Sequence, residues 1–184
     1  MDAAALATAC RALARGGIVA YPTEAVFGLG CDPADAAAVD RLLALKGRPW
    51  QKGLILIAAD ETMLQPWIGP LDDDMRVRLE GSWPGPATWL LPAATDCPQR
   101  VRGEHETIAV RVTDHPVAAA LCRAWGGALV STSANRGGGE PARDAATVRD
   151  LFGDDIEFVL DAPVGGLARP TPIRDARTGA TLRD

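Results

Sequence analysis

The sequence predicts a mixed α/β fold in which one twisted sheet of parallel and antiparallel strands is flanked by helices. Short apolar runs alternate along the chain with longer segments whose apolar residues recur at helical spacing. Two of these runs, near Ile18 and Val26, follow each other closely, so some neighbouring strands should be antiparallel. With 184 residues, 47% of them hydrophobic, the chain can bury one substantial core, and we expect a single domain over residues 1–184.

Glycine and proline mark the ends of the predicted helices. An Ala- and Leu-rich helix ends at Gly16-Gly17, and a later one begins at Pro116 and ends at Gly126-Gly127. Between Asp35 and Leu45, apolar residues recur at helical spacing. The predicted helices comprise residues 1–15, Asp35–Leu45, Leu71–Leu79, Pro116–Trp125 and Asp144–Leu151.

The predicted strands are short, apolar and bounded by turn residues. The run Ile18–Tyr21 stops at Pro22, and Val26–Gly30 is an apolar segment whose glycines allow close backbone approach. Trp83–Pro86 should form a turn, and the segment from Gly165 onward is expected to be rich in loops. The predicted strands comprise Ile18–Tyr21, Leu54–Ala58, Thr88–Leu91, Thr107–Arg111, Ala128–Val130 and Ile156–Leu160.

Composition limits the compartment and the partners. A net charge of −5 and a pI near 5.0 argue against a broad surface for nucleic acid, but they leave room for a local basic cleft. No stretch resembles a signal peptide or approaches the roughly 20 apolar residues that span a bilayer, so we expect a soluble cytoplasmic protein without membrane contact. The four widely separated cysteines should be reduced. Neither His105 nor His115 has a neighbouring metal-ligand pattern, and His115 before Pro116 should open a helix.

The segment Ser131–Asn135 combines hydroxyl and amide side chains at the end of a predicted strand. It follows the apolar run Ala128–Val130 and leads into Arg136 and three glycines. These residue types are common in turns, but the same groups at a strand end can hold a ligand at the edge of a sheet. Gly137–Gly139 lacks the patterns of known phosphate-binding loops, so a flexible loop is expected there.

A basic segment, Lys46–Gly53, lies between a predicted helix and a predicted strand. A lysine in the last turn of a helix is favoured by the helix dipole and needs no ligand, which accounts for Lys46 better than for Arg48. Arg48 lies past the helix end and precedes Pro49, whose rigid backbone could fix the direction of the guanidinium. Lys46 and Arg48 together could grip different oxygens of one polyphosphate.

Other candidates also have two interpretations. Thr23 and Glu24 follow a predicted strand and could be turn residues or site residues. Arg111 ends a predicted strand, where it could be solvated or could clamp a substrate carboxylate with its two-pronged guanidinium. No nucleophilic triad can be assigned from the spacings, so we expect chemistry by positioning and charge stabilisation of the bound reactants.

An ordered set of motifs resembles the YrdC/TsaC family and extends over nearly the whole chain. The segments that carry the resemblance are Gly17–Glu24 with Gly28-Leu29-Gly30, Lys46–Pro49, Trp83–Thr88, Ala109–Arg111 with His115-Pro116, and Ser131–Asn135. The resemblance implies a concave active-site face and a threonylcarbamoyl-AMP synthase, a nucleotidyltransferase that uses L-threonine, bicarbonate and ATP and releases pyrophosphate. It further implies Mg²⁺ accompanying ATP, tRNA as the downstream acceptor, and separate proteins that transfer the threonylcarbamoyl group.

The resemblance also implies roles for individual residues. The motif K-x-R falls on Lys46 and Arg48 and the motif S-x-N on Ser133 and Asn135, which are the implied catalytic residues. The implied ATP-binding residues are Lys46, Arg48, Lys52, Thr107, Ser133 and Asn135. The implied threonine-binding residues are Thr23, Arg111, Ser131 and Thr171.

The chain departs from the family pattern at two places. Ile57 stands where some longer relatives have histidine, and Thr171-Pro172 replaces a more usual Ser-Thr pair. Because the chain ends soon after Thr178-Gly179, we expect the short bacterial type. The alternative functions are a noncatalytic RNA-binding or ribosome-maturation factor of the same fold and a carbamoyl-transfer enzyme of the hydrogenase-maturation type.

Overall fold

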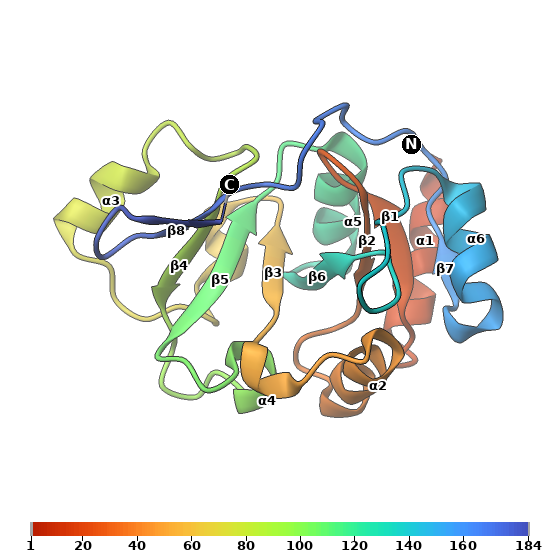
Figure 1. The fold of residues 1–184 in the computed structure, drawn as a ribbon, viewed down its shortest axis with the longest axis horizontal. Helices are drawn as coiled ribbons and strands as arrows, with labels where there is room; N and C mark the ends of the chain where they lie inside the picture. The colour runs from red at the N-terminus through yellow and green to blue at the C-terminus, as the bar shows by residue number, and fades with distance from the viewer. Residues whose placement is uncertain (1, 184) are drawn as a thin grey trace.

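The computed structural model describes residues 2–183, and one mixed sheet runs through them (Figure 1). The strands lie in the order β7-β1-β2-β6-β3-β5-β4-β8-β9. Their bounds are β1 Val19–Pro22, β2 Phe27–Gly30, β3 Ile55–Ala58, β4 Thr88–Pro92, β5 Thr107–Val112, β6 Leu129–Ser133, β7 Phe158–Val159, β8 Ile173–Asp175 and β9 Thr181–Arg183. The pairs β1–β7, β3–β5 and β4–β8 are parallel, and the other neighbours are antiparallel, which confirms the predicted mixed sheet.

Helices cover both faces of this sheet. The α-helices are α1 Ala3–Leu13, α2 Ala36–Lys46, α3 Asp73–Leu79, α4 Gln99–Arg102, α5 Pro116–Trp125 and α6 Ala145–Phe152. Short 3₁₀ turns are η1 Trp50–Lys52, η2 Glu61–Leu64 and η3 Gly153–Asp155. Along β1 the side chains alternate between two cores: Ala20 packs in the core that includes α2, α3, α4 and α6, whereas Val19 and Tyr21 pack in the core with α1 and α5.

The ends of α2 follow from its flanking residues. The Asp35 side chain accepts hydrogen bonds from the N–H groups of Ala37 and Ala38 at 3.0 and 3.1 Å, which caps the N-terminus. Gly47 takes the left-handed conformation with φ of 56°, which ends the helix and turns the chain toward Arg48. Lys46 is therefore the last residue of α2, at the start of the basic segment.

One expectation about a strand end was wrong. The strand predicted to stop at Val130 continues to Ser133, because Ser131 pairs with Ile55 of β3 and Ser133 pairs with Gly28 of β2. The C-terminal segment from Gly165 onward lies mostly outside helices and strands, as expected, and it contains two short strands, β8 paired with β4 and β9 paired with β8. Within residues 2–183, no helix has the length and apolar character needed to cross a membrane.

Gly30 leaves room for the ring of Tyr21 on the neighbouring strand. The buried Tyr21 hydroxyl donates a hydrogen bond to the Val130 carbonyl at 2.9 Å, with its ring against β2. A methyl group on Gly30 would lie 2.8 Å from the Tyr21 ring and would also meet the Val130 carbonyl oxygen. The close approach of these three strands therefore depends on glycine at this position.

Replacing Gly30 with alanine should lower the free energy of unfolding by about 3 kcal/mol, since ring and backbone would both have to shift. Denaturant titration followed by tryptophan fluorescence measures the change. Gly127→Ala is the matched control, because the nearest atom to its added methyl group is 4.0 Å away. Equal losses in the two variants would contradict the steric argument.

Candidate functional site

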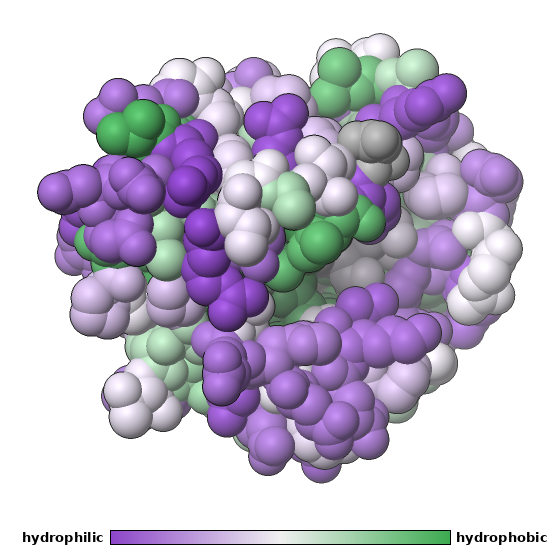
Figure 2. All heavy atoms as spheres, turned by 60° about the vertical axis from the view of Figure 1, so that its left-hand side comes forward, coloured by the Kyte–Doolittle hydropathy of each residue, from purple (hydrophilic) through white to green (hydrophobic). Residues whose placement is uncertain are grey.

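A cleft of about 400 Å³ opens among the strands β2, β3, β5 and β6 and the C-terminal strands β8 and β9. Figure 2 shows a hollow on one face of the molecule that is bordered mostly by hydrophilic residues. Eight of the ten site residues predicted from the sequence line the cleft, namely Thr23, Arg48, Lys52, Thr107, Arg111, Ser131, Ser133 and Thr171. The other two, Lys46 and Asn135, are bonded to Ser133 or to each other rather than lining it.

The cleft is cationic although the whole chain is acidic. Its lining contains five permanent or near-permanent cations, which are Arg48, Lys52, Arg102, Arg111 and Arg183, and none of its described lining residues is Asp or Glu. Burial, together with the nearby charge of Arg183, lowers the pKa of Arg48. Burial, together with the charge of Arg111, likewise lowers the pKa of Arg183. Positive charges held this close together favour an anionic ligand.

The backbone carbonyls of Lys52 and Gly53, at the end of η1 and just before β3, hold the side chain of Arg48. Its Nε and Nη2 atoms donate to the Gly53 carbonyl at 3.0 and 2.8 Å, and Nη2 also reaches the Lys52 carbonyl at 3.3 Å. The direction of the guanidinium is thus set by these bonds as well as by the extended Pro49, whose φ is −64°. One edge of the Arg48 guanidinium is therefore anchored to the backbone, and Arg48 also lines the cleft.

Lys46 joins the end of α2 to the loop after β6. Its Nζ donates to the Ser133 carbonyl and to the Asn135 side-chain oxygen, each at 2.6 Å, and to the Asn135 carbonyl. An ammonium group has three N–H donors, so these acceptors use all of them. Burial, with the charge of Arg48 as a second cause, lowers the pKa of Lys46 to about 8. In this structure Lys46 therefore holds the end of β6 and the following loop against α2. The two interpretations from the sequence, stabilisation by the helix dipole and contact with a phosphate, did not include this role.

Asn135 has a similar internal role. Its Oδ1 accepts from Ser133 Oγ at 2.7 Å as well as from Lys46, and its Nδ2 donates to the Gly139 carbonyl at 2.7 Å and the Arg136 carbonyl at 3.2 Å. The amide thus ties the glycine-containing turn back to β6. Of these residues, Ser133 is the one that also lines the cleft, and its oxygen keeps the capacity to accept hydrogen bonds.

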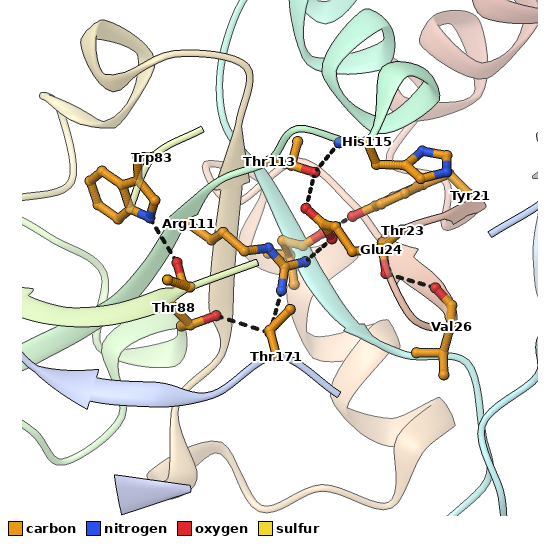
Figure 3. A network of polar contacts seen from close by, with 12 residues as sticks. Tyr21, Thr23, Glu24, Val26, Trp83, Thr88, Arg111, Thr113, His115 and Thr171 are labelled. Carbon is orange, nitrogen blue, oxygen red and sulfur yellow. Dashed lines mark hydrogen bonds and ion pairs between the residues drawn. The ribbon is translucent and has the colours of Figure 1, made fainter. Parts of the chain in front are cut away.

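Arg111 lies at the centre of a second polar network, near the end of β5 (Figure 3). Its Nη1 donates to Thr171 Oγ1 at 2.5 Å, and its Nη2 lies 3.4 Å from Glu24 Oε2. Its Nε is buried without a hydrogen-bond partner. Arg111 is only 5% exposed, so the solvated alternative is excluded. Arg111 lines the cleft, and its Nη1 and Nη2 atoms carry four N–H groups for these two partners.

The remaining predicted residues of this region are also buried. Thr23 donates to the Val26 carbonyl at 2.7 Å, which closes the turn between β1 and β2. Ser131 and Thr107 are buried on β6 and β5. Ile57, the position that departs from the family pattern, is fully buried with Tyr21 on the face of the sheet that α1 and α5 cover. It is not among the residues that line the cleft. The roles of these residues in binding stay predictions.

Sequence reasoning missed three basic residues of the cleft, Arg102, His105 and Arg183. Arg183 lies on β9 and donates from Nη2 to the Thr171 carbonyl at 2.9 Å, so the C-terminal strand closes one side of the site. The alternation of polar and apolar residues from Thr181 to Arg183 is too short to predict a strand. No local signal could have placed Arg183 beside Arg48 and Arg111.

A cationic cleft over the central strands of a mixed sheet, lined by hydroxyl groups, is suited to an anionic ligand such as a nucleotide. The profile of the Sua5/YciO/YrdC family, described as "Telomere recombination", matches residues 11–183. The chain belongs to this family. The fold predicted from the sequence is thereby confirmed as the fold of this family.

Individual relatives agree with this assignment. A threonylcarbamoyl-AMP synthase of Halorhodospira halophila is 60% identical over 171 residues, which are 93% of this chain and 90% of the relative. A protein of the same name from Nitrosococcus oceani is 55% identical over 175 residues, or 95% of each chain. The structure of P. abyssi Sua5 complexed with L-threonine superposes with a TM-score of 0.87 at 29% identity and covers 92% of this chain. This chain covers 50% of the length of that protein.

Proposed function

We propose that this protein is a threonylcarbamoyl-AMP synthase, a nucleotidyltransferase that joins L-threonine, bicarbonate and ATP and releases pyrophosphate. The observation that carries the proposal is the cationic cleft, in which Arg111 lies near the end of β5 while Arg48 is held at the start of the adjacent strand β3. Two cationic positions in one cleft suit two anionic reactants, the carboxylate of an amino acid and a polyphosphate. The relatives named threonylcarbamoyl-AMP synthase support it across nearly their full length.

The amino acid belongs at the Arg111 end of the cleft. There Nη1 and Nη2 of Arg111 have N–H groups beyond those that face Thr171 and Glu24, and Thr23, Ser131 and Thr171 line the same cleft with small polar side chains. A carboxylate can accept two parallel hydrogen bonds from such a guanidinium. The nucleotide belongs at the other end, where Arg48, Lys52, Thr107 and Ser133 line the cleft.

The reaction then needs positioning rather than a protein nucleophile. Bicarbonate takes up a proton and loses water to give carbon dioxide. The threonine nitrogen bonds to the carbon of this carbon dioxide and gives up a proton that replaces the one consumed, which gives a carbamate. An oxygen of the carbamate attacks the α-phosphorus of ATP, and the bond from that phosphorus to the bridging oxygen breaks to release pyrophosphate. Arg48 and Lys52 offset the charge that grows on the leaving phosphates, while Arg111 holds the threonine end in line.

Mg²⁺ would enter with ATP rather than occupy a site built by the protein. Protein-held Mg²⁺ usually has one or two carboxylate ligands, and the described residues that line the cleft include none. The donor set therefore does not fit a resident ion, and the ion would be held by the phosphate oxygens. No step of the reaction above is assigned to it.

The product would be consumed in the cytoplasm by separate proteins that transfer its threonylcarbamoyl group to adenosine in tRNA. The competing function, a noncatalytic RNA-binding factor, is not favoured by the relatives. The cleft also holds its arginines in a hollow of about 400 Å³, which is the size of a small-molecule site rather than of an RNA surface.

Mass spectrometry of the reaction product tests the proposal. The protein incubated with ATP, L-threonine, Mg²⁺ and isotopically labelled bicarbonate should yield threonylcarbamoyl-AMP that carries the label, together with pyrophosphate. Omission of any one substrate should abolish the product. Tight, salt-sensitive RNA binding in a protein that turns over no ATP would instead support the RNA-binding function.

A further inference from the structure

Glu24 is a buried carboxylate that the proposed reaction does not use. It follows β1, and the sequence left open whether it is a turn residue. Its exposure is only 4%, whereas turn residues normally face solvent. Glutamate is rarely buried to this extent unless it is paired, so its partners indicate what it does.

The two carboxylate oxygens of Glu24 have different partners (Figure 3). Oε1 accepts a hydrogen bond from Thr113 Oγ1 at 2.6 Å, and the Thr113 hydroxyl in turn accepts from the His115 backbone N–H at 3.2 Å. Oε2 has no hydrogen-bond donor and lies 3.4 Å from Arg111 Nη2. The carboxylate is thus anchored on the connection from β5 to α5 and presents its other oxygen to the guanidinium.

These contacts restrict the plane of the Arg111 guanidinium. Glu24 faces Nη2, Thr171 accepts from Nη1, and Nε stays unpartnered. Arg111 lines the cleft and Glu24 does not, so the carboxylate can act on a ligand only through the arginine. Recognition of a carboxylate by two parallel hydrogen bonds depends on the orientation of that plane.

Glu24 also supplies the negative charge that this group of arginines otherwise lacks. The charge of Arg111 contributes to the lowered pKa of Arg183, so the two guanidinium groups repel each other. The Glu24 carboxylate is the anion that faces Arg111 within salt-bridge distance among the described residues. Without it, Arg111 would be driven away from Arg183 and out of its present position.

We infer that Glu24 is a positioning residue that orients Arg111 for the carboxylate of the amino-acid substrate. The inference rests on the proposed function, because it names the group that prepares the threonine end of that site. It predicts an effect confined to the amino acid, since among the described residues the Glu24 side chain bonds to Thr113 and pairs with Arg111, neither of which is at the nucleotide end.

Glu24→Gln tests the inference because it keeps the size and the oxygen facing Thr113 while it removes the charge. We expect the KM for L-threonine to rise roughly 10- to 100-fold, with the KM for ATP changed less than about twofold, since a small misorientation of a substrate-binding group has effects of this size. In calorimetric titrations, the preference for L-threonine over L-threoninamide should shrink, because the amide has no charged carboxylate to recognise. A purely structural role would not move this preference.

Glu157→Gln is the matched control. Glu157 pairs with Arg41 at 2.5 Å and accepts from the Ile18 N–H at 2.5 Å, at the opposite end of β1 from Glu24. It should lower stability without changing the KM for threonine. If Glu24→Gln does not fold, Thr113→Val provides the second variant, since it removes the hydrogen bond that anchors Glu24 and leaves the ion pair in place. It should raise the KM for threonine in the same direction.

The outcomes separate the two proposals. A protein that forms no threonylcarbamoyl-AMP overturns the proposed function, and the role of Glu24 falls with it. An active protein in which Glu24→Gln raises the KM values for ATP and threonine equally, or leaves both KM and the preference over threoninamide unchanged, overturns the role of Glu24 alone.

Discussion

Replacing Arg111 with methionine should weaken L-threonine binding by about 100- to 1000-fold, since removal of one partner of a buried, hydrogen-bonded charge pair costs about 3–4 kcal/mol. Arg111 is buried, lines the cleft and keeps an unpartnered Nε, so its donors are oriented before any ligand arrives. Titration calorimetry with L-threonine, and the KM for threonine at saturating ATP, measure the loss. Arg149→Met is the matched control, because Arg149 pairs with Asp161 on the surface and should leave both quantities unchanged.

The single variant also leaves the Glu24 carboxylate buried without its cation, which should lower the free energy of unfolding by about 3 kcal/mol. The double variant Glu24→Gln/Arg111→Met removes both charges and should recover most of this stability. It should not recover threonine binding. A double variant that binds threonine as tightly as the unsubstituted protein would show that Arg111 does not hold the substrate carboxylate.

The helix ends could be predicted from the sequence because single residues determine them. Pro116 and Gly126 bound α5, and Asp35 and Gly47 bound α2, each through a local backbone or capping requirement. The strands at the C-terminus could not be predicted, since β8 has only three residues and gains its hydrogen bonds from β4, which is distant in sequence. Such pairing has no local periodicity to reveal it.

The site likewise has features that could be predicted from the sequence and features that could not. The resemblance to the family identified eight residues that line the cleft, but it could not give the direction of each side chain. Lys46 could be expected to meet either solvent near the helix end or a phosphate. Its Nζ instead donates to carbonyls at the end of β6 and just after it, almost ninety residues further along the chain. The arginine cluster was incompletely predicted for a related reason, because Arg183 comes from a strand that the sequence did not reveal.

Replacing Lys46 with methionine should lower kcat/KM for ATP by about 100-fold, although Lys46 does not line the cleft. The variant leaves the partly buried Asn135 carbonyl without the Lys46 donor and the Ser133 carbonyl with the Asn135 N–H as its remaining donor, which should also cost about 1–2 kcal/mol of stability. The loop after β6 should then open, and Ser133 should lose its fixed position at the nucleotide end. Hydrogen exchange of residues 133–139 in the protein without substrates measures this loosening directly. A lysine that acts only by touching phosphate would leave this exchange unchanged when it is replaced.

The protonation of Lys46 provides an independent measurement. Because its pKa is lowered to about 8, Lys46 is mostly a protonated ammonium group with three N–H donors below that pH. Above that pH the neutral amine has two N–H groups for three acceptors. At saturating bicarbonate, kcat/KM for ATP should therefore fall as the pH rises from about 7 to 9. Lys46→Arg should be less active at neutral pH, since a planar guanidinium cannot converge on the same three oxygens, but it keeps its charge throughout this range. The ratio of kcat/KM for ATP of the unsubstituted protein to that of Lys46→Arg should therefore decrease as the pH rises. A ratio independent of pH would contradict the role assigned to the ammonium group.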